Sequence, residues 1–94
     1  MTLDTLREQI DLLDNEMLRL LNQRAQYALQ LGKIKQGQKA EIYVPERERQ
    51  ILERLMGLNA GPLSHQSVQE LFLLIFKTMR DLQQQQLLRT QEET

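Results

Sequence analysis

The 94-residue sequence has no cysteine, a single histidine and no long apolar run. The lack of cysteine excludes disulfides, and His65 alone cannot supply the ligands of a zinc or haem site, so we expect it to be a solvated turn or cap residue. A membrane-spanning helix needs roughly 18 or more consecutive apolar residues, which are not present. The first residues, MTLDTLREQI, lack the basic-then-apolar order of a signal peptide. We therefore expect a soluble, cytoplasmic domain with no metal and no membrane contact.

The chain also lacks an excess of charge of either sign, because its 12 lysines and arginines nearly balance its 13 aspartates and glutamates. The chain has no global positive field of the kind that attracts nucleic acid, so any site for an anion must be local. A chain of this length forms one domain, and its core is marginal unless the chain oligomerises.

Apolar residues recur in steps of three and four from Leu3 to Ile34, with no proline to interrupt them. This period predicts one helix from about Asp4 to about Gln36, which Gly37 would end. The helix would be roughly 50 Å long, about twice the ~25 Å breadth of a compact chain of this size. Its apolar face cannot be buried within one chain, so a homodimer is expected.

Two further helices are predicted, which makes the fold all-α. Pro45 suits the first position of a second helix, PERERQILERLMGL, and the turn-forming NAGPLS follows it. The third helix, about Ser64 to Gln86, contains LFLLIF, which is apolar on nearly all sides. Residues 1–94 are interpreted as a single domain, with an ordered core over about 3–86 and a polar tail over 87–94.

One charged residue interrupts the apolar seam of the first helix. Written as heptads, that helix has two apolar positions, and Arg24 is the only charged residue at either of them. An arginine keeps its charge when buried, so the fold must either supply an anion or tolerate an unpaired cation. The two positions hold Leu3, Ile10, Met17, Arg24 and Leu31, and Leu6, Leu13, Leu20, Tyr27 and Ile34.

Four more polar residues lie on faces predicted to be inward. Lys35 follows Arg24 by 11 residues, close to three helical turns, so the two share a face of the first helix. Gln83 continues an apolar stripe of the third helix, and Arg47 and Glu48 lie near the start of the second. Burying several donors without acceptors costs a few kcal/mol each. This cluster favours a small anionic ligand.

Each of these residues also has a purely structural interpretation. Arg24 could fix the register of a coiled coil, and Lys35 could extend to solvent at a helix end. Gln83 could be the first residue of a solvated glutamine tract. Arg47 and Glu48 could be ordinary surface charges, since a glutamate is favoured in the first turn by the helix dipole.

The sequence resembles the all-helical chorismate mutases over about residues 3–86. The similarity is carried by LREQIDLLDNEMLRLLNQR, GKIK, PERERQILERL and LFLLIFKTMRDLQQQQ, in the family's order and approximate spacing. The resemblance implies an intertwined homodimer in which the long first helix spans both active sites. It also implies a small dicarboxylate substrate, chorismate, which rearranges to prephenate without metal or cofactor.

The resemblance further implies a role for each polar residue. Arg24 and Arg7 of the partner subunit would grip substrate carboxylates. Lys35 and Gln83 would donate hydrogen bonds to the ether oxygen. Glu48 would accept from the ring hydroxyl, and Arg47 would add positive potential and orient Glu48.

Two positions depart from the family pattern. Val44 stands where the family often has an aspartate, and Met79 stands where it often has a serine, so each removes a polar contact at a predicted substrate-binding position. Two alternatives remain: isochorismate pyruvate lyase, which has the same fold and forms salicylate, and a non-catalytic dimerisation or regulatory module. Glu48 favours the mutase, because the lyase resembles this pattern without a carboxylate at that position.

Overall fold

The computed structural model describes residues 1–38 and 40–93, which form three α-helices and no strand. Helix α1 spans Leu3–Gln38, α2 spans Pro45–Leu58 and α3 spans His65–Glu93. The all-α prediction is confirmed, and the order and approximate bounds of the helices agree with the pattern of apolar residues. Within the described residues, no helix is both long and apolar enough to cross a membrane.

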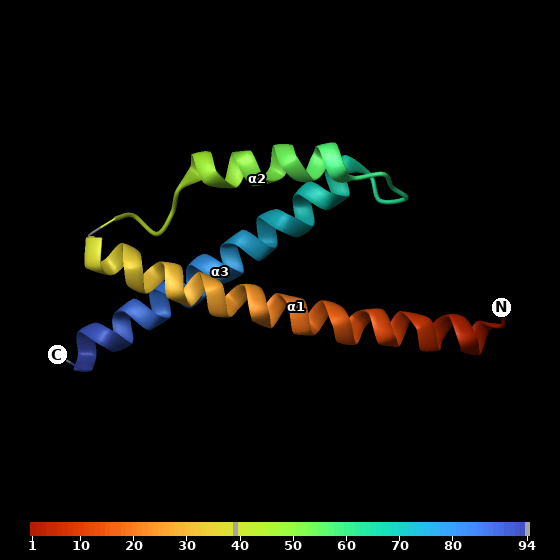
Figure 1. Ribbon diagram of the computed structural model, residues 1–94, viewed down its shortest axis with the longest axis horizontal. Helices are drawn as coiled ribbons and strands as arrows, with labels where there is room; N and C mark the ends of the chain where they lie inside the picture. Colours follow the sequence, from red (N-terminus) through yellow and green to blue (C-terminus); the bar gives the residue numbers. More distant parts are fainter. Residues whose placement is uncertain (39, 94) are drawn as a thin grey trace.

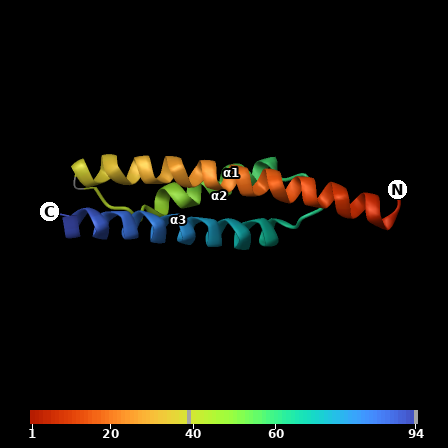
Figure 2. The same cartoon turned by 90° about the horizontal axis from the view of Figure 1, so that it is seen from below.

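Helix α3 is the element on which both other helices pack. Figure 1 shows α3 crossing the second half of α1, with α2 running above them from the α1–α2 loop to the start of α3. Turned on its side in Figure 2, the molecule has α1 and α3 in two separate layers. The apolar core inside this arrangement is small, and its buried residues are Ala28, Ile51, Val68, Phe76 and Met79.

The chain is elongated and leaves much of α1 uncovered. Its extents are 57 × 28 × 15 Å and its radius of gyration is 16.8 Å, against roughly 12 Å for a compact chain of this length. The amino-terminal part of α1 runs past both other helices in Figures 1 and 2. Apolar residues along it stay 46–64% exposed, namely Leu3, Leu6, Ile10, Leu13, Met17 and Leu20. Contiguous apolar surface of this kind supports the expectation that a second chain covers it.

Two helix ends lie further along the chain than the sequence predicted. Gly37 was expected to end α1 but lies inside its last turn, because the helix continues to Gln38. Helix α3 continues past the expected end at Gln86 and reaches Glu93, so the predicted end of this helix was wrong. Residue 94 of the predicted polar tail lies outside the described residues. At the predicted end, Gln86 is tied to α1, since its Nε2 donates a 3.1 Å hydrogen bond to the carbonyl oxygen of Leu29.

The α2–α3 turn is held by the side chain of Asn59. Its Oδ1 accepts a 3.1 Å hydrogen bond from the Gly61 amide, and its Nδ2 donates to the Leu63 carbonyl at 2.9 Å. Gly61 has φ +81°, a left-handed conformation that favours glycine. Ser64 then caps α3 by accepting a 3.0 Å hydrogen bond at its hydroxyl from the amide three residues on. His65 is the first residue of that helix, in agreement with its predicted place at a turn or cap.

Candidate active site

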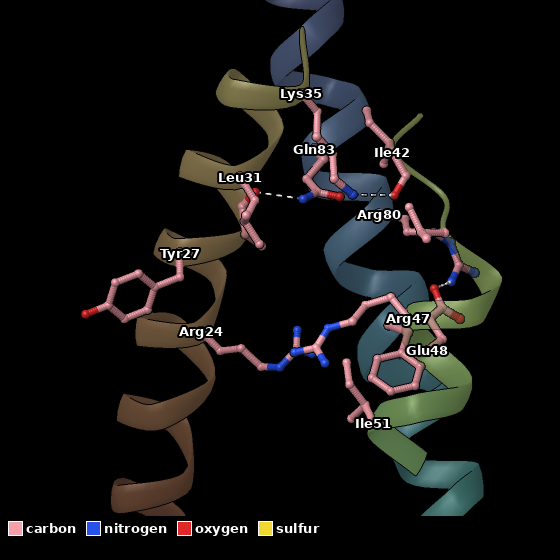
Figure 3. A pocket seen from close by; sticks show the side chains of 13 residues that line it. Arg24, Tyr27, Leu31, Lys35, Ile42, Arg47, Glu48, Ile51, Arg80 and Gln83 are labelled. Carbon is pink, nitrogen blue, oxygen red and sulfur yellow. Dashed lines mark hydrogen bonds and ion pairs between the residues drawn. The ribbon is translucent and has the colours of Figure 1, made fainter. Parts of the chain in front are cut away.

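A pocket of about 180 Å³ lies between the three helices and the loop that joins α1 to α2. Helix α1 contributes its second half, α2 contributes its first turns and α3 contributes its middle (Figure 3). The structure brings together six of the eight predicted site residues in the wall of this pocket, namely Arg24, Lys35, Val44, Arg47, Glu48 and Gln83.

Two arginines point toward one another across the pocket. Figure 3 shows Arg24 extending from α1 and Arg47 extending from α2, with their guanidinium groups facing each other. Burial lowers the pKa of the half-buried Arg24, and the positive charge of Arg47 lowers this pKa further, whereas Glu48 acts in the opposite direction. Among the side chains that the structure describes, no carboxylate forms an ion pair with Arg24. A bound anion between the two groups would relieve this repulsion.

Arg24 also lies over an aromatic ring. Its guanidinium carbon is 5.7 Å from the centroid of Phe76 on α3, within the range of a cation–π contact. This contact joins the Arg24 side chain of α1 to α3 at the wall of the pocket. Arg24 is thus one of the residues that line the pocket.

Gln83 is a buried polar residue at the crossing of α1 and α3. It is 7% exposed, and its Nε2 donates a 2.7 Å hydrogen bond to the carbonyl oxygen of Ala28. The alternative in which Gln83 opens a solvated glutamine tract is thus wrong. A glutamine amide carries two hydrogens, so the second one is available to an acceptor in the pocket.

Lys35 lies near the carboxyl end of α1 and is half-buried. Its Nζ is 3.5 Å from the carbonyl oxygen of Ile42 in the loop before α2, which links the end of α1 to that loop (Figure 3). A contact of this length is weak, so little is lost when the ammonium group turns to a stronger acceptor inside the pocket.

The carboxylate of Glu48 forms an ion pair with Arg80 on α3, a residue that was absent from the predicted site. The Arg80 guanidinium also stacks on Tyr43, with its carbon 4.5 Å from the ring centroid. Arg80 follows Phe76 by four residues and precedes Gln83 by three, so helical periodicity already placed it on the same face of α3. That spacing was the signal that could have identified it.

Two predicted residues do not line this pocket. Arg7 lies on the exposed part of α1, about 25 Å along the helix axis from Arg24, and its role in another chain's site stays a prediction. Met79, predicted at a substrate-binding position, is buried and lines a separate, more apolar groove between α1 and α3. Within one chain, Met79 therefore lies apart from the other predicted site residues, and its role in substrate binding stays a prediction.

The pocket is small for a complete ligand site. Its volume of about 180 Å³ is below the roughly 300–1,000 Å³ typical of small-molecule sites. In the described part of the chain, no group of three or more histidine, cysteine, aspartate or glutamate side chains could hold a metal ion. The polar side chains in the pocket wall are those of three arginines, Lys35, Gln83, Glu48 and Tyr27.

These features define an all-helical domain with a cationic pocket between three helices. More specifically, the chain belongs to the type II chorismate mutase family, whose family model matches residues 6–84.

Known relatives and solved structures agree with this assignment. A bifunctional chorismate mutase/prephenate dehydratase from Neisseria gonorrhoeae is 52% identical over 66 residues, which is 70% of this chain and 18% of that protein. A chorismate mutase from Helicobacter pylori, solved in complex with prephenate, has a TM-score of 0.84 and 38% identity, covering 90% of this chain and 92% of that one. The form II structure of a Thermus thermophilus chorismate mutase has a TM-score of 0.87 and 32% identity, covering 88% and 94%. The chain spans only about a fifth of the length of the bifunctional relative.

Proposed function

We propose that this chain catalyses the rearrangement of chorismate to prephenate. The observation that carries the proposal is the pair of opposed guanidinium groups, Arg24 and Arg47, facing one another with no carboxylate from the described side chains paired to Arg24. A carboxylate of the substrate would be the missing anion. Membership of the family and the prephenate complex of the Helicobacter pylori protein support this choice of substrate.

The reaction is an intramolecular [3,3] rearrangement in which one C–O bond breaks as one C–C bond forms. It needs no group transferred from outside, so the protein contributes by holding the flexible enolpyruvyl ether in a compact, chair-like conformation. Arginine suits this task, because its fork of N–H donors binds a carboxylate through two parallel hydrogen bonds. Arg24 would hold one carboxylate in this way, and Arg47 would contribute positive potential beside it.

Negative charge develops on the ether oxygen as the C–O bond lengthens. Lys35 and the second amide hydrogen of Gln83 are the donors proposed to stabilise that charge. Both residues line the pocket, and Gln83 is held in place by its hydrogen bond to Ala28. Donors that are already oriented act most strongly on charge that forms in the transition state.

Glu48 is proposed to accept a hydrogen bond from the ring hydroxyl of chorismate. Its position in the pocket favours the mutase over isochorismate pyruvate lyase, the alternative that the sequence left open. Val44 also lines the pocket, so the polar contact that an aspartate would supply there is missing. We expect Val44 to lower affinity for the substrate without removing the cationic groups.

The complete site is proposed to need two chains. The small volume of the pocket and the exposed apolar residues of α1 both support a homodimer with two equivalent sites. Arg7 of the partner subunit would then add a second arginine to each site. The long α1 would be the element that connects the two sites.

Incubation with chorismate and, separately, with isochorismate tests the proposal directly. Loss of substrate is followed by absorbance, and the product is identified by mass spectrometry. We expect prephenate from chorismate and no turnover of isochorismate. Salicylate from isochorismate would assign the lyase instead, and the absence of both reactions would assign a non-catalytic module. Arg54→Met, which changes an exposed arginine of α2, is the matched control and should keep full activity.

A further inference from the structure

We propose that Arg80 is a positioning residue that holds the carboxylate of Glu48 away from Arg24 and Arg47, which keeps these two arginines available for the substrate. The inference rests on the function proposed above. It deepens that function by assigning a role to a residue that the proposed chemistry does not use.

The ion pair between Arg80 and Glu48 differs from the other ion pairs of the molecule. Within the described side chains, four ion pairs join residues one turn apart on a single helix, and their side chains are 52–66% exposed. The pair of Arg80 and Glu48 joins α3 to α2, and the two side chains are 28% and 18% exposed. Surface pairs within a helix contribute little, whereas a partly buried pair fixes two groups in one geometry.

Without Arg80, the carboxylate of Glu48 could form an ion pair with either of two other cations in the pocket wall. Arg47 is its neighbour in the chain, and the charge of Glu48 already acts on the pKa of Arg24. Figure 3 shows the carboxylate of Glu48 directed toward the Arg80 guanidinium, with which it is paired, and not toward the Arg24 guanidinium. A carboxylate released from Arg80 would pair with Arg24 or Arg47 and compete with the substrate for them.

Arg80 is itself held by a second contact. Its guanidinium lies over the ring of Tyr43, in the loop before α2, with 4.5 Å between the carbon and the ring centroid. A cation–π contact leaves the edges of the guanidinium free to donate hydrogen bonds, so Tyr43 and Glu48 can bind Arg80 at the same time. Arg80 thereby connects α3, α2 and the loop between α1 and α2 at one corner of the pocket.

The test is a double-mutant cycle on Arg80 and Glu48, read out as binding and as turnover. Binding of prephenate is measured by calorimetry, and kcat and KM are measured with chorismate, for the intact chain, Arg80→Met, Glu48→Gln and the double variant. We expect Arg80→Met to raise the Kd and KM by about tenfold, the effect of losing roughly one charge-assisted contact. In the Glu48→Gln background, the same change should alter the Kd by less than about twofold, because a neutral amide does not compete for Arg24.

A merely structural role for Arg80 would weaken binding equally in both backgrounds, and that result would overturn the proposal. Unchanged binding and turnover in Arg80→Met, with an active unmodified chain, would also overturn it while leaving the proposed function intact. Absence of turnover in the unmodified chain would overturn the function and this role together.

Arg80→Lys keeps the proposal testable should Arg80→Met fail to fold. Lysine retains the charge but lacks the forked donors of arginine, so Arg80→Lys should raise the Kd of the intact chain by more than twofold and less than about tenfold. In the Glu48→Gln background, Arg80→Lys should leave the Kd unchanged within about twofold. Arg54→Met is the matched control for removing an arginine. Circular dichroism and sedimentation confirm that each variant keeps its helices and its assembly state.

Discussion

The Nε2 atom of Gln83 lies 2.7 Å from the carbonyl oxygen of Ala28, and this hydrogen bond joins α3 to α1 where the two helices cross. Because Gln83 is buried, the same side chain supports the helix packing and forms part of the pocket wall. Lys35 differs, since it is half-buried and its Nζ lies 3.5 Å from a loop carbonyl oxygen. The two proposed donors to the ether oxygen should therefore respond differently to substitution.

Gln83→Ala and Lys35→Ala should both lower kcat/KM by about 10²–10³, the usual effect of losing one donor to a developing negative charge. Gln83→Ala should also lower the free energy of unfolding by about 1–3 kcal/mol, because it removes a buried hydrogen bond and leaves a cavity. Lys35→Ala should change it by less than about 0.5 kcal/mol. Steady-state kinetics and urea denaturation measure these effects. Near-normal turnover in both variants would contradict the assigned roles.

Gly32 of α1 faces Gln83 across the helix crossing. A Cβ atom at this position would lie 3.4 Å from Gln83 Cγ and 3.6 Å from Gln83 Cβ, which is ordinary contact. Gly32→Ala should therefore keep activity and stabilise the helix by about 0.5–1 kcal/mol. Gly32→Leu should displace Gln83 and lower both stability and kcat/KM, at a cost of about 1–3 kcal/mol. Equal activity in the two variants would show that Gln83 does not need its observed position.

Arg24→Leu separates a substrate-binding arginine from one that fixes helix register. The fold should tolerate or even gain from this change, because replacing a half-buried charge by an apolar group often stabilises. Turnover should be abolished, since the substrate carboxylate loses a bidentate contact. Thermal unfolding and a chorismate assay measure the two effects. An active, more stable Arg24→Leu variant would favour the register interpretation.

Arg7→Ala should behave like Arg24→Leu if Arg7 acts across a dimer. Mixing the two inactive variants gives a heterodimer in which one site carries both lesions and the other carries neither. After random exchange of subunits, about a quarter of the normal activity should return. Mass spectrometry confirms that the heterodimer has formed. Heterodimers without any recovered activity would show that Arg7 and Arg24 do not meet in one site.

Sedimentation at micromolar concentration should give the mass of a dimer. The expectation follows from the radius of gyration of 16.8 Å, which is too large for a compact chain, and from the exposed apolar residues of α1. A well-folded monomer under these conditions would be inconsistent with a site that uses Arg7 of the partner subunit.

The sequence was sufficient to predict the helices and most of the pocket, because both depend on periodicity. The spacing of three and four residues between apolar positions of α1 predicted that Arg24 and Lys35 share one face. The same spacing along α3 predicted that Gln83 lies on the inward face of that helix. The structure agrees on all three, which line one pocket. Local spacing is enough here, since neighbouring turns of one helix fix the direction of their side chains.

Contacts between helices were harder to predict. Arg80 lies on the predicted face of α3, yet its pairing with Glu48 depends on how α2 crosses that helix, and its stacking on Tyr43 depends on the path of the loop. Met79 was carried over from the family pattern, whereas the structure buries it in the packing of α1 on α3. The end of α3 was missed because polar glutamines look like a solvated tail, although Gln86 donates to a carbonyl on α1.

The apolar amino-terminal part of α1 bears on how quickly activity appears after the chain is made. A helix that leaves Ile10, Leu13 and Met17 exposed cannot complete its burial until it encounters another molecule. In the proposed dimer, the final step of folding is then bimolecular, and its rate rises with the concentration of chains. Refolding from denaturant should give helical signal first and turnover later, with a delay that lengthens on dilution, and the melting temperature should rise with protein concentration.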